Sequence, residues 1–324
     1  MIKVPAMMKS NEFGFKQDVK IIDLLKSQKF TFSAEIIPPR NGVEQVKVLD
    51  QIKVLISAGA EFFSVTKGAG GSLRGGSLPI SQAIKDQFGV PCIAHFTCRD
   101  MTPQEVENQL MDHHYFGIRN ILALRGDPPT DQPDWRPHSE SLRYAYQLIR
   151  QIRELNEGRF LPRPGARSDQ NQVATDFCIG AAVYPEHPVA SEKIEFLKMK
   201  VDEGAEYGIT QMIFDASVYA QFLEDCAKQG LQVPILPGSL ILRSQAQAHR
   251  MMKRFGIQVS AKIMNKLPAE REANGVGRVV DLFLEYLEDL KRVGAPGVHL
   301  FVMSDIEASS GALEKMKLLE VGDG

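Results

Sequence analysis

Glu35 is the residue whose surroundings in the sequence point most clearly to chemistry. It stands in the apolar run of residues 32–37, directly before two prolines. A carboxylate flanked by apolar residues is costly to bury as a charge, so it is either paired with a cation such as Arg40 or has a raised pKa. A carboxyl group that stays protonated near neutral pH can act as a general acid. We expect that role for Glu35.

Polar residues also end several other apolar runs. His95 lies in one of them, and a lone histidine of this kind is either a hydrogen-bonded core residue or a ligand-binding group. Arg125, Gly126 and Asp127 end another run and are followed by two prolines. A fixed guanidinium, a glycine that exposes the backbone and a carboxylate form a compact set for recognising a polar ring or a phosphate.

Other reaction classes find less support in the sequence. A glycine-rich stretch, residues 67–72, follows Thr66 and could let a ligand approach the backbone, although turns also use glycine for positive φ. The histidines and carboxylates show no standard metal-ligand spacing, and there is no G-x-S-x-G, P-loop or strand-linked G-x-G-x-x-G. We therefore expect no metal site, and acyl transfer and Rossmann-type nucleotide binding are disfavoured.

These polar residues need a scaffold that gathers the ends of strands, and the sequence predicts one. Short β-branched or apolar runs alternate with helical segments, which is typical of an α/β protein with a parallel sheet. Eight runs can be identified, at residues 30–37, 62–66, 91–96, 120–124, 177–182, 208–213, 234–240 and 297–302. Eight repeats predict a closed (β/α)8 TIM barrel with its chemistry at the carboxyl ends of the strands. A two-domain, doubly wound sheet is the alternative.

The intervening segments predict helices and inserted loops. Helical spacing of apolar residues is found at residues 43–58, 103–116, 191–203, 217–229 and 276–292. Insertions are expected at 128–139, 158–176 and 243–274. We expect an N-terminal helical cap at residues 1–29, a TIM-barrel catalytic domain at 30–310 and a C-terminal tail at 311–324.

Composition limits the partners and the compartment. The 324 residues carry 38 lysines and arginines against 40 aspartates and glutamates, interspersed along the chain, so nucleic acid is not an expected partner. No stretch approaches the length of a membrane span, and the first residues do not resemble a signal peptide, so we expect a cytoplasmic protein. The four cysteines never form a C-x-x-C pair and are expected to be buried thiols.

Six of these motifs, taken in order, resemble the bacterial type of the methylenetetrahydrofolate reductase family. The motifs are residues 32–35 with 38–39, 65–66 with 68–72, 95–98, 123–128, 184–188 and 209–211. The resemblance implies a TIM barrel that holds noncovalent FAD. It also implies hydride transfer from NADH or NADPH to 5,10-methylenetetrahydrofolate, which gives 5-methyltetrahydrofolate for methionine synthesis in one-carbon metabolism.

The resemblance also implies roles for individual residues. Glu35 would be the general acid that helps to open the five-membered ring of the folate, Asp127 would lie near both flavin and pterin, and Gln211 would hydrogen-bond the substrate. The implied FAD contacts are Thr66, Ala69, His95, Arg125, Gly126, Asp127, Ala145, Ala182, Tyr184, His187, Ala190 and Lys200. Arg125 and Lys200 are suited to the diphosphate.

Departures from the family pattern lie mainly on the substrate side. Ile241 stands in place of a proline, Gln245 in place of an aromatic residue, and Ser304 with Asp305 in place of an Asn-Arg pair. Two alternatives therefore stay open. One is a reductase of the same fold with a partner-supplied electron donor or without tightly bound flavin. The other is a flavin- or folate-binding subunit of a larger complex. A homo-oligomer is also compatible with the sequence.

Overall fold

The computed structural model describes most of the chain. The described residues are 8–27, 29–39, 43–68, 75–129, 132, 134–163, 172–272, 275–303 and 305–322, and for 190, 191 and 319–322 only the backbone is described.

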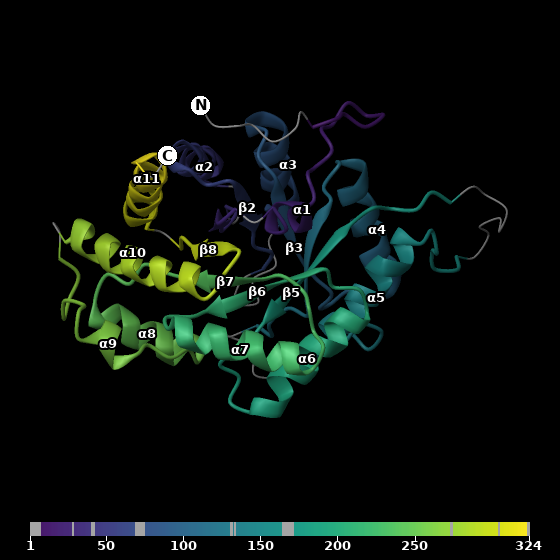
Figure 1. Cartoon of the computed structure of the whole chain (residues 1–324). Helices are drawn as coiled ribbons and strands as arrows, with labels where there is room; N and C mark the ends of the chain where they lie inside the picture. Colours follow the sequence, from purple (N-terminus) through teal and green to yellow (C-terminus); the bar gives the residue numbers. More distant parts are fainter. Residues whose placement is uncertain are drawn as a thin grey trace.

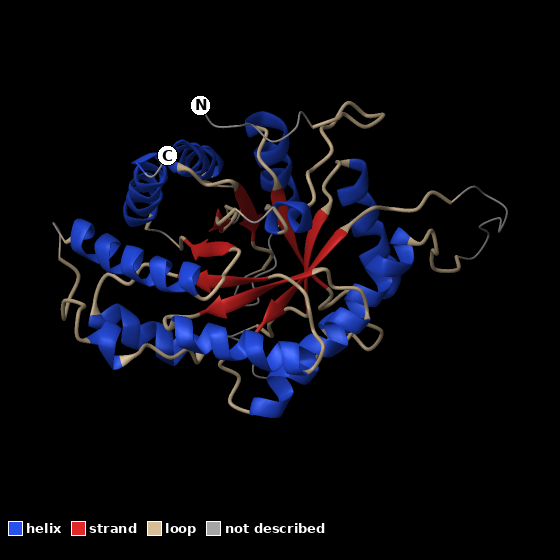
Figure 2. Ribbon diagram, in the orientation of Figure 1, coloured by secondary structure: helices blue, strands red, loops and turns tan. Residues whose placement is uncertain are grey.

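Eight parallel strands close into a barrel in which each strand pairs with its neighbours in the sequence and the last pairs with the first. The strands are β1 (Thr31–Ile36), β2 (Phe62–Val65), β3 (Cys92–Thr97), β4 (Asn120–Leu124), β5 (Cys178–Val183), β6 (Tyr207–Met212), β7 (Ile235–Ser239) and β8 (Gly297–Phe301). Figures 1 and 2 show the helices arranged around these strands. The predicted (β/α)8 TIM barrel is confirmed, and the doubly wound alternative is excluded because no strand order reverses.

The five predicted helical segments are all helices, and the barrel has others that the spacing did not indicate. The helices are α1 (Ile21–Leu25), α2 (Gln45–Ala58), α3 (Ser77–Phe88), α4 (Pro103–Tyr115), α5 (Ala145–Asn156), α6 (Ala190–Asp202), α7 (Ala216–Lys228), α8 (Gln245–Phe255), α9 (Ala261–Met264), α10 (Val276–Arg292) and α11 (Ile306–Gly322). The predicted insertion at 243–274 contains α8 and α9. Residues 311–322, set apart as a tail by the sequence, continue α11, which packs against α2 and α10.

Helix α4 illustrates how local sequence fixes an element. Thr102 accepts a hydrogen bond from the backbone N of Glu105 at 3.3 Å, and the Glu105 carboxylate accepts from the backbone N of Thr102 at 2.7 Å. This reciprocal capping box, with Pro103 as the first helical residue, starts the helix at a defined position. The loop between β3 and α4 is thereby kept short and fixed.

Side chains that alternate along the strands fill the interior of the barrel. A layer of apolar residues from six strands is closed at the amino-terminal end by Ile21, Ile22 and Leu25 of α1. Asn120 fixes this helix, because its Oδ1 accepts from the Ile21 backbone N at 2.8 Å and its Nδ2 donates to the Val19 carbonyl at 2.9 Å. The floor of the barrel is thus a packed core, and the polar inward positions lie toward the carboxyl ends of the strands.

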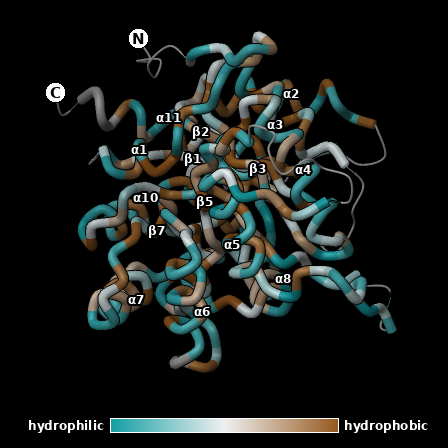
Figure 3. The backbone as a smooth tube through the Cα atoms, turned by 90° about the vertical axis from the view of Figure 1, so that its right-hand side faces the viewer, coloured by the Kyte–Doolittle hydropathy of each residue, from teal (hydrophilic) through white to brown (hydrophobic). Residues whose placement is uncertain are grey.

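Hydrophobic residues gather around the strands at the centre of the molecule, and hydrophilic residues cover much of its outside (Figure 3). All four cysteines are buried, as predicted. In the part of the chain that the structure describes, no helix is both long and apolar enough to cross a membrane.

Candidate active site

Glu35 and His95 meet inside the carboxyl-terminal end of the barrel. Glu35 lies on β1 and His95 on β3, and their Oε2 and Nε2 atoms are 3.9 Å apart. Burial raises the pKa of Glu35 to about 8 and lowers that of His95 to about 4. Both groups are therefore neutral at pH 7, so their contact is not an ion pair. Arg40, the sequence alternative as a partner for Glu35, lies outside the described residues.

A hydrogen-bonded layer lies on the strands next to Glu35. Nδ1 of His299 on β8 is 2.8 Å from Oγ of Ser33, and its Nε2 is 3.0 Å from Oγ of Ser64. Burial is the main cause that lowers the pKa of His299 to about 3, and His95 adds to it. Sequence reasoning missed His299. The only indication in the sequence was that side chains of β8 alternate between its two faces. This alternation does not show which face points into the barrel until the pairing of the strand is known.

Three polar atoms at the ends of β2 and β3 are buried and lack a hydrogen-bond partner among the described residues. They are Oγ1 of Thr66, Nε2 of His95 and Oγ1 of Thr97. A buried polar group without a partner is destabilising, by about 1–3 kcal/mol in protein variants. Two of the three belong to the implied FAD contacts. A molecule bound at this end of the barrel could satisfy all three atoms.

The end of β4 presents a charged turn to the same opening. Arg125 and Asp127 are exposed, and Gly126 between them has a φ of +93°. A Cβ on Gly126 would come within 3.0 Å of the Arg99 Cβ and 3.2 Å of the Thr97 Cβ, so a larger residue would push the turn away from β3. The glycine is therefore required by both conformation and space.

Lys200 and Tyr184 lie beside this turn. Nζ of Lys200 on α6 donates to the Ala182 carbonyl at 2.7 Å and lies 5.6 Å from the centroid of the Tyr184 ring. Burial lowers the pKa of Lys200 to about 8. The pKa of Tyr184 is raised by desolvation and, to a smaller extent, by Asp127, although the residue as a whole is 44% exposed. The structure thus brings the polar ends of β4, β5 and α6 together.

Gln211 and His187 share a pocket of about 180 Å³ with Tyr184. The Gln211 Oε1 accepts from the backbone N of Met212 at 3.0 Å, and its amide nitrogen donates no hydrogen bond to another residue that the structure describes. His187 is held locally, because its Nδ1 accepts from the Val189 backbone N at 3.3 Å and its Nε2 is 3.8 Å from Glu192.

For three of the residues predicted to contact FAD, the structure shows no interaction with the residues described above. Ala145 is the first residue of α5, and no hydrogen bond or ion pair among the described residues connects it with the others. Ala190 begins α6, but its side chain is not described. Ala69 lies outside the described residues.

Lys67 and Arg99 are polar residues of this region that sequence reasoning left without a role. Nζ of Lys67 lies 4.1 Å from the centroid of the Phe96 ring and donates to Gln109, and burial lowers its pKa to about 8. Arg99 lies in the loop after β3, and its side chain donates a hydrogen bond to the backbone carbonyl of Asp127, in the turn after β4. Lys67 contacts β3 and α4, and Arg99 contacts the turn after β4, so no local pattern in the sequence indicates these contacts. Among the described residues, no group of three or more His, Cys, Asp or Glu side chains could hold a metal ion.

The substrate-side departures lie near β7 and β8. Ile241 is buried, and Gln245 is turned toward the α9 segment, where its Nε2 donates to the carbonyls of Met264 and Leu267 at 3.0 and 3.1 Å. Asp305 accepts from the Arg243 Nη1 at 2.9 and 3.0 Å. Ser304 lies outside the described residues.

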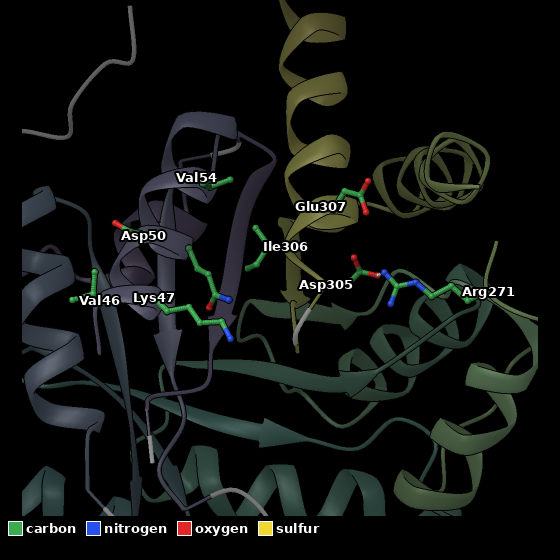
Figure 4. Close-up of a pocket in the computed structure, with 9 residues that line it drawn as sticks. Val46, Lys47, Asp50, Val54, Arg271, Asp305, Ile306 and Glu307 are labelled. Carbon is green, nitrogen blue, oxygen red and sulfur yellow. Dashed lines mark ion pairs between the residues drawn. The ribbon is translucent and has the colours of Figure 1, made fainter. Parts of the chain in front are cut away.

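Asp305 also borders an open pocket of about 630 Å³ between α2 and the start of α11. Figure 4 shows Arg271 and Asp305 pointing toward each other, with Lys47 extending from α2 and Glu307 on α11. The Arg271 Nη2 and the Asp305 Oδ2 are 3.9 Å apart. Because Arg243 is only 4% exposed, the negative charge of Asp305 is balanced inside the protein rather than offered to a ligand.

The chain matches known proteins along most of its length. The sequence pattern of the family described as methylenetetrahydrofolate reductase matches residues 20–317. "Methylenetetrahydrofolate reductase 1" of Schizosaccharomyces pombe is 31% identical over 300 residues, which are 90% of this chain and 47% of that protein. "5,10-methylenetetrahydrofolate reductase" of Escherichia coli is 30% identical over 285 residues, 86% of this chain and 87% of the relative.

A solved structure supports the fold. A protein from Clostridium thermocellum, described as binding two copies of 5-methyl-5,6,7,8-tetrahydrofolic acid, superposes with a TM-score of 0.56 at 17% identity, covering 92% of this chain and 99% of that one. The chain spans about half the length of the yeast relative but most of the bacterial one. With a family match over nearly the whole barrel and relatives at 30% identity, the chain belongs to the methylenetetrahydrofolate reductase family.

Proposed function

We propose that this chain is an FAD-dependent reductase that transfers a hydride from NADH or NADPH to 5,10-methylenetetrahydrofolate, giving 5-methyltetrahydrofolate. Family membership and the coverage of the bacterial relative support the reaction. The structural observation that carries it is the set of three buried atoms, on Thr66, His95 and Thr97, that have no hydrogen-bond partner in the described part of the chain. They lie beside a carboxyl group whose pKa is raised to about 8.

The residues present fit a flavin dinucleotide. The atoms on Thr66 and His95 require hydrogen-bond partners of the kind that a flavin ring offers through its carbonyl and nitrogen atoms. Arg125 and Lys200 supply two positive charges for a diphosphate. Bound FAD supplies the chemistry that side chains lack, namely acceptance of a hydride from the nicotinamide and its donation to the folate.

Further contacts with the cofactor are assigned to the rim. We include Ala182 and Tyr184 at the end of β5, Gly126 and Asp127 after β4, and His187 before α6. Ala69, Ala145 and Ala190 complete the proposed set. Tyr184 offers a ring face for stacking. The Lys200 ammonium, which lies near this ring, would balance the charge of a phosphate.

Glu35 holds the proton that the reaction needs. Opening of the five-membered ring breaks a C–N bond, and the departing nitrogen must receive a proton. With a pKa near 8, Glu35 is protonated at neutral pH, and the neutral His95 beside it does not remove that proton because its own pKa is near 4. Asp127 and Gln211 are assigned to orient the pterin, Asp127 from the turn after β4 and Gln211 through its amide nitrogen.

The test is an absorbance spectrum of the purified chain, followed without oxygen while NADH or NADPH and then methylenetetrahydrofolate are added. Flavin colour that bleaches with the nicotinamide and returns with the folate is expected. A yellow protein that neither nicotinamide bleaches would favour a partner-supplied donor. A colourless chain that FAD cannot reconstitute would contradict the proposal. Turnover by the isolated chain separates an enzyme from a binding subunit, and cell fractionation tests the proposed cytoplasmic location.

A further inference from the structure

The side chain of Arg99, just beyond β3, reaches across to the connection between β4 and α5. Its backbone N donates to the Arg125 carbonyl at 3.0 Å, and its Nη1 donates to the backbone carbonyl of Asp127. Its Cζ lies 5.0 Å from the centroid of the Trp135 ring. One residue of the β3–α4 loop therefore contacts three positions of the neighbouring connection, and two of these contacts are made by its guanidinium.

Arg99 is itself held in place. It is only 7% exposed, and its Nε pairs with the Asp100 Oδ2 at 2.8 Å. Asp100 has a left-handed backbone with a φ of +61°, a conformation that is uncommon outside glycine and so depends on its surroundings. Gly126 lets the two loops approach closely, because a Cβ there would lie 3.0 Å from the Arg99 Cβ. The guanidinium is thus fixed by its charge partner and by close packing.

The structure assigns Arg99 as a positioning residue for Asp127. The peptide bond is planar, so the hydrogen bond to the Asp127 carbonyl restricts the backbone from which the carboxylate projects. This inference rests on the proposed function, in which Asp127 lies near the flavin and the pterin. Arg99 acts through Asp127, and its own charge is paired with Asp100 rather than directed to the diphosphate.

The geometry requires arginine at this position rather than any cation. A planar guanidinium can donate to a carbonyl, pair with a carboxylate and lie over an aromatic ring at once, whereas an ammonium group is a compact point charge. Arg99→Lys should therefore behave like Arg99→Gln and should not restore the wild-type properties. This expectation separates positioning from a general need for positive charge.

Trp135 provides a direct readout, because it is the only tryptophan in the chain. In the FAD-free protein, Arg99→Gln and Arg99→Lys should shift the tryptophan emission to longer wavelength as the ring loses its cover. Arg119→Gln is the matched control, since it removes an ion pair with Asp176, 2.5 Å in length, that lies just before β4. Unchanged emission in both Arg99 variants would overturn the assignment.

A double-variant cycle then tests whether Arg99 acts through Asp127. With FAD bound, Asp127→Asn should shift the midpoint potential of the flavin, and Arg99→Gln should shift it in the same direction by less. Arg99→Gln should also lower kcat for folate reduction about tenfold, as expected for a misplaced group, with little change in KM for the nicotinamide. In the Asp127→Asn background, Arg99→Gln should add almost nothing.

The outcomes are distinguishable. Additive shifts in potential would show that Arg99 acts independently of Asp127 and would overturn the inference. Equal losses in Arg99→Gln and Arg119→Gln would show that Arg99 only stabilises the fold and would overturn it as well. A wild-type chain that does not bind FAD would contradict the proposed function. In that case the tryptophan emission of the FAD-free variants still decides whether Arg99 holds the connection between β4 and α5.

Discussion

Glu35 and His95 face each other across the mouth of the barrel, 3.9 Å apart, and burial moves their pKa values in opposite directions. The carboxyl group becomes a weaker acid and the imidazole a weaker base. The pair therefore stays uncharged across the physiological range, and a proton on Glu35 is available to a substrate rather than to its neighbour.

Glu35→Gln should abolish the proton transfer and leave the cofactor site intact. We expect the rate of folate reduction to fall by about 10² to 10⁴, the usual contribution of a general acid, while reduction of the flavin by the nicotinamide is unchanged. In the wild type, folate reduction should decline as the pH rises through about 8, because Glu35 then loses its proton. Rapid-mixing measurements of the two half-reactions at pH 6–9 test this, and a flat profile for folate reduction would exclude Glu35 as the acid.

Thr66→Val should have opposite effects on the free protein and on its complex with FAD. Valine has nearly the shape of threonine but no hydroxyl, so it removes a buried oxygen that has no hydrogen-bond partner among the described residues. We expect the FAD-free chain to gain about 1 kcal/mol in free energy of unfolding and FAD affinity to fall about tenfold. Denaturant unfolding and fluorescence titration with FAD measure the two quantities.

Thr31→Val is the matched control for that variant. Thr31 Oγ1 donates to the Pro296 carbonyl at 3.2 Å on the first residue of β1, at the other end of the barrel. The same substitution should there lower the free energy of unfolding and leave FAD affinity unchanged. If both variants weaken FAD binding equally, the unpartnered oxygen of Thr66 has no special relation to the cofactor.

Lys200→Met should weaken FAD binding about tenfold or more, because it removes the charge-assisted contact that we propose with the diphosphate. Burial lowers the pKa of Lys200 to about 8 in the free protein, so the fraction of charged lysine falls as the pH rises through that value. Wild-type FAD affinity should therefore decrease between pH 7 and 9, and that part of the decrease should be missing in the variant.

Lys198→Met tests whether the loss of any lysine from α6 would weaken FAD binding in the same way. Lys198 lies on the same helix, is exposed and pairs with Asp202 at 2.9 Å. Its removal should change neither the affinity for FAD nor its pH dependence. Isothermal titration at several pH values compares the three proteins.

Asp305→Ala should be strongly destabilising. It leaves the guanidinium of Arg243, which is 4% exposed, without its closest carboxylate, and breaking a buried pair costs about 3–5 kcal/mol. The double variant Arg243→Leu with Asp305→Leu should recover most of the lost stability, since no buried charge is then left unpaired and Arg271 is exposed to solvent. Urea unfolding measures both, and a single variant as stable as the wild type would show that Glu307, 3.9 Å from the Arg243 Nη1, or solvent replaces Asp305.

The barrel could be predicted from the sequence because its strands are short apolar runs at regular intervals. The run at residues 30–37 corresponds to β1, Thr31–Ile36, with ends that differ by one residue. Helices α3 and α5 were missed. Ser77–Phe88 begins next to a glycine-rich stretch and has a proline in its first turn, and Ala145–Asn156 follows an insertion rich in proline.

The role of Glu35 as a general acid stays a prediction, but its burial and raised pKa could be predicted because it stands in an apolar strand. His299 and Arg99 could not, since their significance depends on contacts between elements distant in the sequence. His299 bonds Ser33 across 266 positions, and no local pattern contains that information. The sequence therefore predicts those features of the candidate site that depend only on burial in an apolar strand. It does not predict the features that depend on hydrogen bonds between strands.

Helix α1 fills the amino-terminal end of the barrel with Ile21, Ile22 and Leu25, so a molecule that reaches Glu35 must enter from the opposite end. A nicotinamide and a folate that both approach the same acid and cofactor would share that single entrance. Each would then hinder the other, and the oxidised nicotinamide would have to depart before the folate could take its place. By closing the amino-terminal end of the barrel, α1 would thus fix the order in which the nicotinamide leaves and the folate binds at the carboxyl-terminal end.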